Sequence, residues 1–207
     1  MRFKIYREYG ALNSVPVFDA VEAGLRQLGH EIVNHDEDIP VIWSVLWNGR
    51  MLGNKKIYDS AKVSGKSVMI IEVGNFCRGK FWRISLNNIN GHGFFGNTQN
   101  LDMDRPSKLG IICHPLKNKR NAEILIAAQH DKSLQWEGQP PLNRWVDLTV
   151  QKIRQFSDRS IVVRPHPRCK FSVNSPRVRL EIPKKETRLW INFQKKQSIL
   201  VLFTQLP

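Results

Sequence analysis

The segment Ser160–Arg168, which reads Ser-Ile-Val-Val-Arg-Pro-His-Pro-Arg, constrains the fold more than any other part of the chain. Its small and β-branched start is typical of a buried parallel strand. Neither proline can lie in a central strand, so the strand must end at about Arg164. The prolines also restrict the backbone around them, which holds Arg164, His166 and Arg168 in a rigid basic turn. Ligands of open α/β sheets bind at the carboxyl ends of strands, so this turn is a candidate phosphate site. The alternative is a solvated turn that only ends a strand.

Short apolar strands alternate with helical patterns in two stretches of the chain, which predicts an α/β fold. In the first stretch we expect strands at 2–6, 30–34, 41–47 and 67–73, and helices at 14–28 and 54–63. In the second, a strand at 122–128, a helix at 142–156 and the strand at 160–163 form a βαβ unit. We predict two Rossmann-like domains with separate parallel sheets, the second domain incomplete. The expected boundaries are an N-terminal domain 1–105, a linker 106–121, a partial domain 122–182 and a basic, then apolar, C-terminal tail 183–207.

The net charge of +14 is unevenly distributed. Residues 1–50 hold 5 basic and 7 acidic side chains, residues 51–163 hold 17 and 9, and residues 164–207 hold 10 and 2. A basic surface of this kind attracts nucleic acid or another polyanion. The chain has no apolar run long enough for a membrane span, and its first residues lack the apolar core of a signal peptide, so we expect a cytoplasmic protein.

The three cysteines, Cys77, Cys113 and Cys169, form no CxxC pair, so the sequence does not indicate a disulfide framework. Cys113 and His114 together with His166 and Cys169 are zinc-ligand types, but their spacings are not those of common zinc sites. The sequence therefore predicts no metal.

Two ordered motifs and one weaker segment carry a resemblance to a known family. A strand runs into Gln129-His-Asp-Lys-Ser133, and a later strand ends in Arg164-Pro-His-Pro167. Upstream lie Glu72-Val-Gly-Asn-Phe76 and Arg83-Ile-Ser-Leu86. Over residues 68–168 this pattern resembles capsule-polysaccharide and phage-type glycosyltransferases of the GT-B fold, and related glycerophosphate transferases.

The resemblance implies two Rossmann domains with a nucleotide sugar bound between them as co-substrate, and no other cofactor. It also has a limit. The segment with which these families hold the donor further along the chain has no counterpart after Arg168. From about residue 182 the chain resembles a truncated or altered relative, which leaves the fold class in place and puts catalysis in question.

Sugar transfer from a nucleotide donor requires positive charge at the departing diphosphate. The residues expected there are Arg164, His166, Arg168, Gln129 and Ser133. An inverting transfer also requires a base near the acceptor hydroxyl, and the candidates are Glu72, Asp131 and Glu8, with Glu72 favoured. Lys80 and Arg83 are the residues expected on the acceptor side. No obligatory metal is expected.

Two functions remain open at this stage. One is a nucleotide-sugar-dependent glycosyltransferase whose acceptor is anionic, with modified viral DNA preferred over a capsule glycan because of the charge. The other is a non-catalytic basic protein that binds nucleic acid and derives from the same fold.

Overall fold

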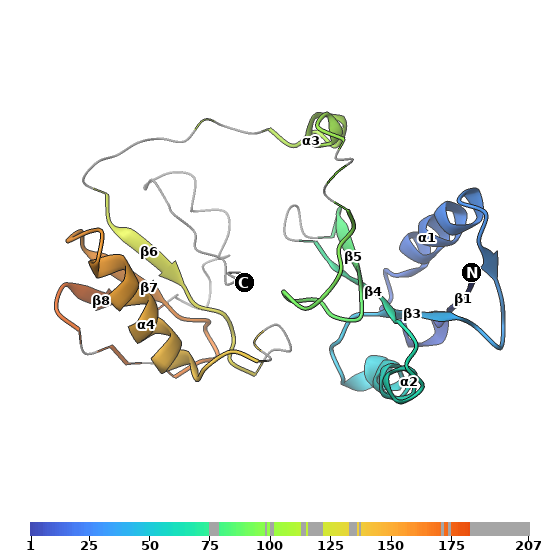
Figure 1. The fold of residues 1–207 in the computed structure, drawn as a ribbon, viewed down its shortest axis with the longest axis horizontal. Coiled ribbons are helices and arrows are strands. Elements are labelled where there is room, and N and C mark those ends of the chain that lie inside the picture. Colours follow the sequence, from blue (N-terminus) through green and yellow to red (C-terminus); the bar gives the residue numbers. More distant parts are fainter. Residues whose placement is uncertain are drawn as a thin grey trace. The chain divides into compact units, whose positions relative to one another are not determined.

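The protein is a mixed α/β structure rich in parallel strands (Figure 1). Its chain divides into two compact units, Met1–Leu101 and Asp102–Pro207. The computed structural model describes residues 1–74, 79–97, 99, 102–112, 115, 122–132, 136, 138–170, 172–173 and 175–182.

The first unit contains a five-stranded sheet of order β2-β1-β3-β4-β5. The strands are β1 (Arg2–Ile5), β2 (Glu31–Ile32), β3 (Ile39–Trp43), β4 (Met69–Val73) and β5 (Trp82–Leu86). The first four strands run parallel, as predicted. The prediction of a wholly parallel sheet is wrong at β5, which pairs antiparallel with β4. Residues 74–81 are too short a connection for the crossover that a parallel strand requires, so the chain reverses direction.

Two helices, α1 (Val15–Gln27) and α2 (Leu52–Val63), cover opposite faces of this sheet (Figure 1). Phe18 and Leu25 of α1 pack with Val41 and Trp43, whereas α2 packs with the side chains on the other face. Helix α1 ends at Gln27, just before Gly29, where the prediction placed its stop and where a φ of +76° favours glycine. Two short 3-10 turns are also present: η1 (Arg7–Tyr9) follows β1, and η2 (Gly49–Met51) precedes α2.

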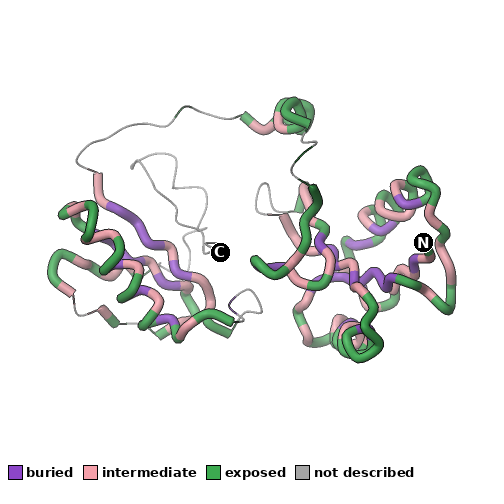
Figure 2. The backbone as a smooth tube through the Cα atoms, viewed as in Figure 1, coloured by how far each residue is buried: buried purple, intermediate pink, exposed green. Residues whose placement is uncertain are grey.

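The second unit contains a three-stranded parallel sheet of order β6-β7-β8. Its strands are β6 (Ile124–Ala127), β7 (Ile161–Arg164) and β8 (Val178–Leu180). Helix α4 (Leu142–Arg154) packs Val146 and Val150 onto the sheet, and β6 and β7 are largely buried (Figure 2). The βαβ unit is thus confirmed, but β8 was not predicted. A short helix α3 (Arg105–Lys108) begins at the edge of the segment expected to be a linker.

In the part of the chain that the structure describes, no helix combines the length and the apolarity needed to cross a bilayer.

Candidate functional site

Strands β6 and β7 bring two turns together at the carboxyl edge of the second sheet. Ala127 lies opposite Arg164 in the parallel register, and the Ala128 N–H donates to the Arg164 carbonyl at 2.9 Å. The chain then leaves β6 through residues 128–132 and leaves β7 through residues 165–169. Because ligands of parallel sheets bind at this edge, the two turns form the candidate site.

Each turn contributes a histidine, and the two rings touch. The centroids of His130 and His166 are 4.8 Å apart, with the rings inclined at 74°. In each ring Nδ1 accepts a backbone N–H from two residues further on, Lys132 at 3.0 Å and Arg168 at 3.2 Å. A neutral ring that accepts at Nδ1 carries its proton on Nε2. Both histidines can therefore donate an Nε2–H to an anion.

Burial, and then the nearby His130 and Arg168, lower the pKa of His166 below its ordinary value. Burial disfavours the charged imidazolium, and neighbouring cationic groups add to that effect. At neutral pH His166 is thus a neutral ring that keeps a lone pair.

Cys169 and Asp131 flank the two rings. The Cys169 N–H donates to the His166 carbonyl at 2.9 Å and closes the turn. The thiol of Cys169 lies 3.5 Å from the Asp131 carboxylate, to which it donates, and burial raises the pKa of this thiol. His130, His166 and Cys169 each offer one ligand atom, and these atoms all lie within 4.8 Å of one another.

The structure describes two members of the zinc-ligand set considered from the sequence. His166 and Cys169 are gathered with His130, which had been assigned only to the loop after β6. Cys113 and His114 lie outside the described residues.

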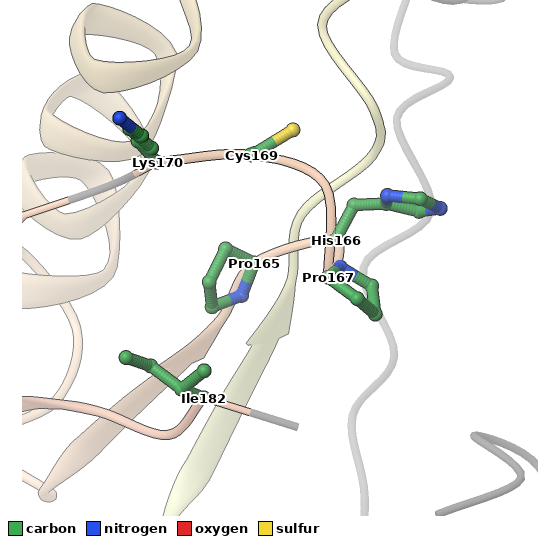
Figure 3. A pocket seen from close by; sticks show the side chains of 6 residues that line it. All are labelled: Pro165, His166, Pro167, Cys169, Lys170 and Ile182. Atoms are coloured by element: carbon green, nitrogen blue, oxygen red, sulfur yellow. The ribbon is translucent and has the colours of Figure 1, made fainter. Parts of the chain in front are cut away.

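An open pocket of about 310 Å³ adjoins the turn after β7 (Figure 3). Its volume is at the lower end of the range for small-molecule sites. The His166 ring and the Cys169 sulfur project away from the Lys170 ammonium group (Figure 3). The pocket is lined by Pro165, His166, Pro167, Cys169, Lys170 and Ile182.

The other expected donor-site residues are placed differently. The Arg164 guanidinium points to the carboxylate of Glu181, 2.7 Å away, so its charge is already engaged. Arg168 is exposed at the turn, and Gln129 is half-buried after β6. Ser133 lies outside the described residues.

In the first unit, Glu72 stands at the carboxyl end of β4 beside Ser44, which follows β3. The Ser44 hydroxyl donates to the Glu72 carboxylate at 2.8 Å, and the Val73 N–H donates to its other oxygen at 2.8 Å. Ser44 is buried with a φ of +61°, an uncommon conformation for a residue other than glycine. The sequence analysis missed Ser44 because it placed this residue inside the strand expected at 41–47, whereas β3 ends at Trp43.

Arg83 of β5 lies directly opposite Glu72 in the antiparallel ladder. Burial lowers the pKa of Arg83, and the charge of Glu72 opposes that shift. The Arg83 Nε is buried without a hydrogen-bond partner in the described structure. Glu72 and Arg83, two site residues predicted from the same segment, are thus directly opposite each other on the neighbouring strands β4 and β5.

The remaining candidates are more isolated. Glu8 is exposed in η1, after β1, which β3 separates from β4 and Glu72. Lys80 is exposed in the turn before β5. Among the three proposed bases, only Asp131 lies at the edge that carries the two histidines.

No protein-family model matches this chain, and a search of curated proteins found no similar one. Fold and site alone therefore define its class, an α/β protein with a histidine-bearing edge on a parallel sheet.

Proposed function

We propose that the chain is a nucleotide-sugar-dependent glycosyltransferase-like protein, built from two Rossmann-like units of the GT-B type. In this proposal the donor diphosphate binds at the carboxyl edge of β6 and β7. The observation that supports it is the pairing of His130 with His166, one from each turn, beside a pocket at that edge.

Transfer of the sugar leaves negative charge on the diphosphate. Two Nε2–H donors and the exposed cation of Arg168 can stabilise that charge, because hydrogen-bond donors fixed before the reaction need not reorganise. Arg164 acts indirectly here, since its ion pair with Glu181 orients the end of β7.

Glu72 serves in this proposal as the base that accepts the proton of the acceptor hydroxyl. Its two hydrogen bonds fix the orientation of the carboxylate. Arg83 and Lys80 supply positive charge for an anionic acceptor. Asp131 is the alternative base at the histidine-bearing edge, and Glu8 is the third candidate.

The charge distribution supports a nucleic-acid acceptor, with viral DNA as the preferred example. Residues 164–207 hold 10 basic and only 2 acidic side chains. Ion pairs engage part of the basic set, including Arg7, Arg26 and Lys55 in the first unit and Arg164 and Arg179 in this segment. The same charge supports the alternative function, a non-catalytic protein that binds nucleic acid.

Calorimetry of the full chain against a panel of nucleotide sugars tests the proposal. We expect His166→Ala and Arg168→Ala each to weaken binding by about one to two decades, the usual cost of a charge-assisted hydrogen bond. Lys152→Ala is the matched control for Arg168→Ala, because it removes one positive charge from the same unit. Lys152 is exposed near the end of α4 that is far from the candidate site.

Equal binding by all three variants would refute the donor site. A chain that binds DNA and no nucleotide sugar would instead support the non-catalytic alternative.

A further inference from the structure

Two imidazoles and a thiol converge at the carboxyl edge of β6 and β7. His130 comes from the first turn, and His166 and Cys169 come from the second. Nitrogen and sulfur ligands of this kind suit zinc and similar transition-metal ions, whereas calcium and magnesium prefer oxygen.

We propose that His130, His166 and Cys169 bind a single transition-metal ion of the zinc type. Three protein ligands with one open position are typical of catalytic rather than structural zinc sites. The Asp131 carboxylate lies 3.5 Å from the Cys169 sulfur and 3.8 Å from the His130 Nδ1. It provides a negative charge next to the ion. Without the ion, it accepts a hydrogen bond from the Cys169 thiol.

The distances are close to those that a bound ion requires. Tetrahedral zinc with Zn–N of about 2.1 Å and Zn–S of about 2.3 Å holds its ligand atoms about 3.4–3.6 Å apart. The three ligand atoms already lie within 4.8 Å of one another, so each separation needs to shorten by at most about 1.4 Å. All three side chains are only partly buried, which leaves room for such a movement.

Binding exchanges existing hydrogen bonds for metal bonds. Each ring now accepts a backbone N–H at Nδ1, at 3.0 and 3.2 Å. Coordination through Nδ1 displaces that donor, and coordination through Nε2 moves the ring proton to Nδ1 and loses the same bond. The cost is about fivefold to tenfold in affinity for each ring, small beside the affinities of nitrogen and sulfur sites for zinc. The Cys169 thiol releases its proton to solvent as the sulfur–metal bond forms.

The metal site does not depend on the nucleotide-sugar proposal. An oxygen of a phosphate group can occupy the open position, in which case the ion supplies the positive charge at the diphosphate. The competing interpretation is that the two rings only pack edge-to-face and that the cysteine closes a turn.

Titration of the purified full chain with Co²⁺, without nucleotide, separates the two interpretations. A thiolate ligand gives a sulfur-to-cobalt charge-transfer band, and tetrahedral coordination gives intense visible bands. We expect both to saturate at one Co²⁺ per chain and to disappear when Zn²⁺ is added. The double variant Cys77→Ser/Cys113→Ser should keep the bands, whereas Cys169→Ser should lose the charge-transfer band.

His130→Ala should weaken Co²⁺ binding by at least about a hundredfold, and His35→Ala, at an exposed histidine of the first unit, should not. Circular dichroism identifies any variant that fails to fold. If His130→Ala does not fold, the charge-transfer band of the conservative variant Cys169→Ser decides whether the ion site exists. Absence of the charge-transfer band in the parent chain, or its persistence in Cys169→Ser, would overturn the proposal.

Calorimetry with nucleotide sugars, after chelation and again with Zn²⁺, tests the other proposal separately. Metal binding without nucleotide binding would leave the ion site standing and refute the donor site. Nucleotide binding by a chain that takes up no metal would support the donor site and refute the ion site.

Discussion

Arg164 and Glu181 join the ends of two strands through an ion pair. The Arg164 guanidinium donates to the Glu181 carboxylate at 2.7 Å, and the Glu181 N–H donates to the Val163 carbonyl at 2.9 Å. The side chain of Arg164 is 18% exposed and that of Glu181 is 39% exposed, so solvent screens the pair only in part. An arginine in a strand-terminating motif thus has a structural role that its position in the motif does not reveal.

Glu181→Gln is expected to lower the free energy of unfolding by about 1 kcal/mol, since it weakens a partly screened charge-assisted hydrogen bond. Urea unfolding measures the change. The matched control is Glu31→Gln, at an exposed glutamate in β2, which should change stability by only a few tenths of a kcal/mol. Equal stability of the two variants would mean that the Arg164 pair contributes nothing net.

Asn54 is expected to be the most sensitive polar residue of the first unit. Its side chain is fully buried, and its amide donates to the Trp43 carbonyl at 2.6 Å and the Tyr9 carbonyl at 3.2 Å. Asn54→Ala leaves both carbonyls without this donor and should cost about 2 kcal/mol. Thermal or urea unfolding checks this, with Asn13→Ala at an exposed position as control. A loss no larger than that of the control would contradict the prediction.

Glu22 should make stability depend on pH in the acid range. Hydrogen bonds from Arg7 and then Arg26 lower its pKa in the folded chain below the ordinary value of 4.5. Its contribution is therefore fully present above about pH 4.5 and is lost as the pH falls through the lower folded-state pKa. Wild type should exceed Glu22→Gln in stability by a few tenths of a kcal/mol at neutral pH, and by less below pH 4. A difference that stays constant with pH would contradict the assignment.

Binding to DNA should be steeply dependent on salt and nearly independent of sequence, because scattered lysines and arginines contact mainly phosphate. A plot of log K against log salt should fall with a slope of about −0.9 for each phosphate contact. Arg168→Ala should reduce the slope by about 1 if Arg168 makes such a contact. Fluorescence anisotropy with two duplexes of unrelated sequence measures both effects. A flat response to salt, or a strong preference for one duplex, would refute the prediction.

The sequence predicted those parts of the fold that depend on local patterns. The β6–α4–β7 unit follows from an apolar strand, an amphipathic helix and a strand that prolines end. Helix α1 was predicted because Val17, Val21, Leu25 and Leu28 recur at helical spacing before Gly29. Parts that depend on distant pairing were missed. In β5 apolar and polar residues alternate only over Trp82–Leu86, and its antiparallel direction follows from its pairing with β4. The three residues of β8 are too few to show a pattern.

The candidate site could be predicted only in part, for the same reason. The turn with His166 and Arg168 was read correctly as the end of a strand, because its prolines act locally. The contact with His130 depends on β6 and β7 lying side by side in one register. The ion pair of Arg164 could not be predicted, since its partner Glu181 lies 17 residues away in the chain.

A crossover helix separates the two histidine-bearing turns, so related sites in other chains will not appear as a compact motif. His130 stands three residues after the end of β6, and His166 stands two residues after the end of β7. Cys169 follows three residues later. Insertion or deletion within α4 can change the distance between the histidines along the chain without moving them apart in space. Searches for such sites should therefore count positions from the ends of adjacent parallel strands, and leave the length of the intervening helix free.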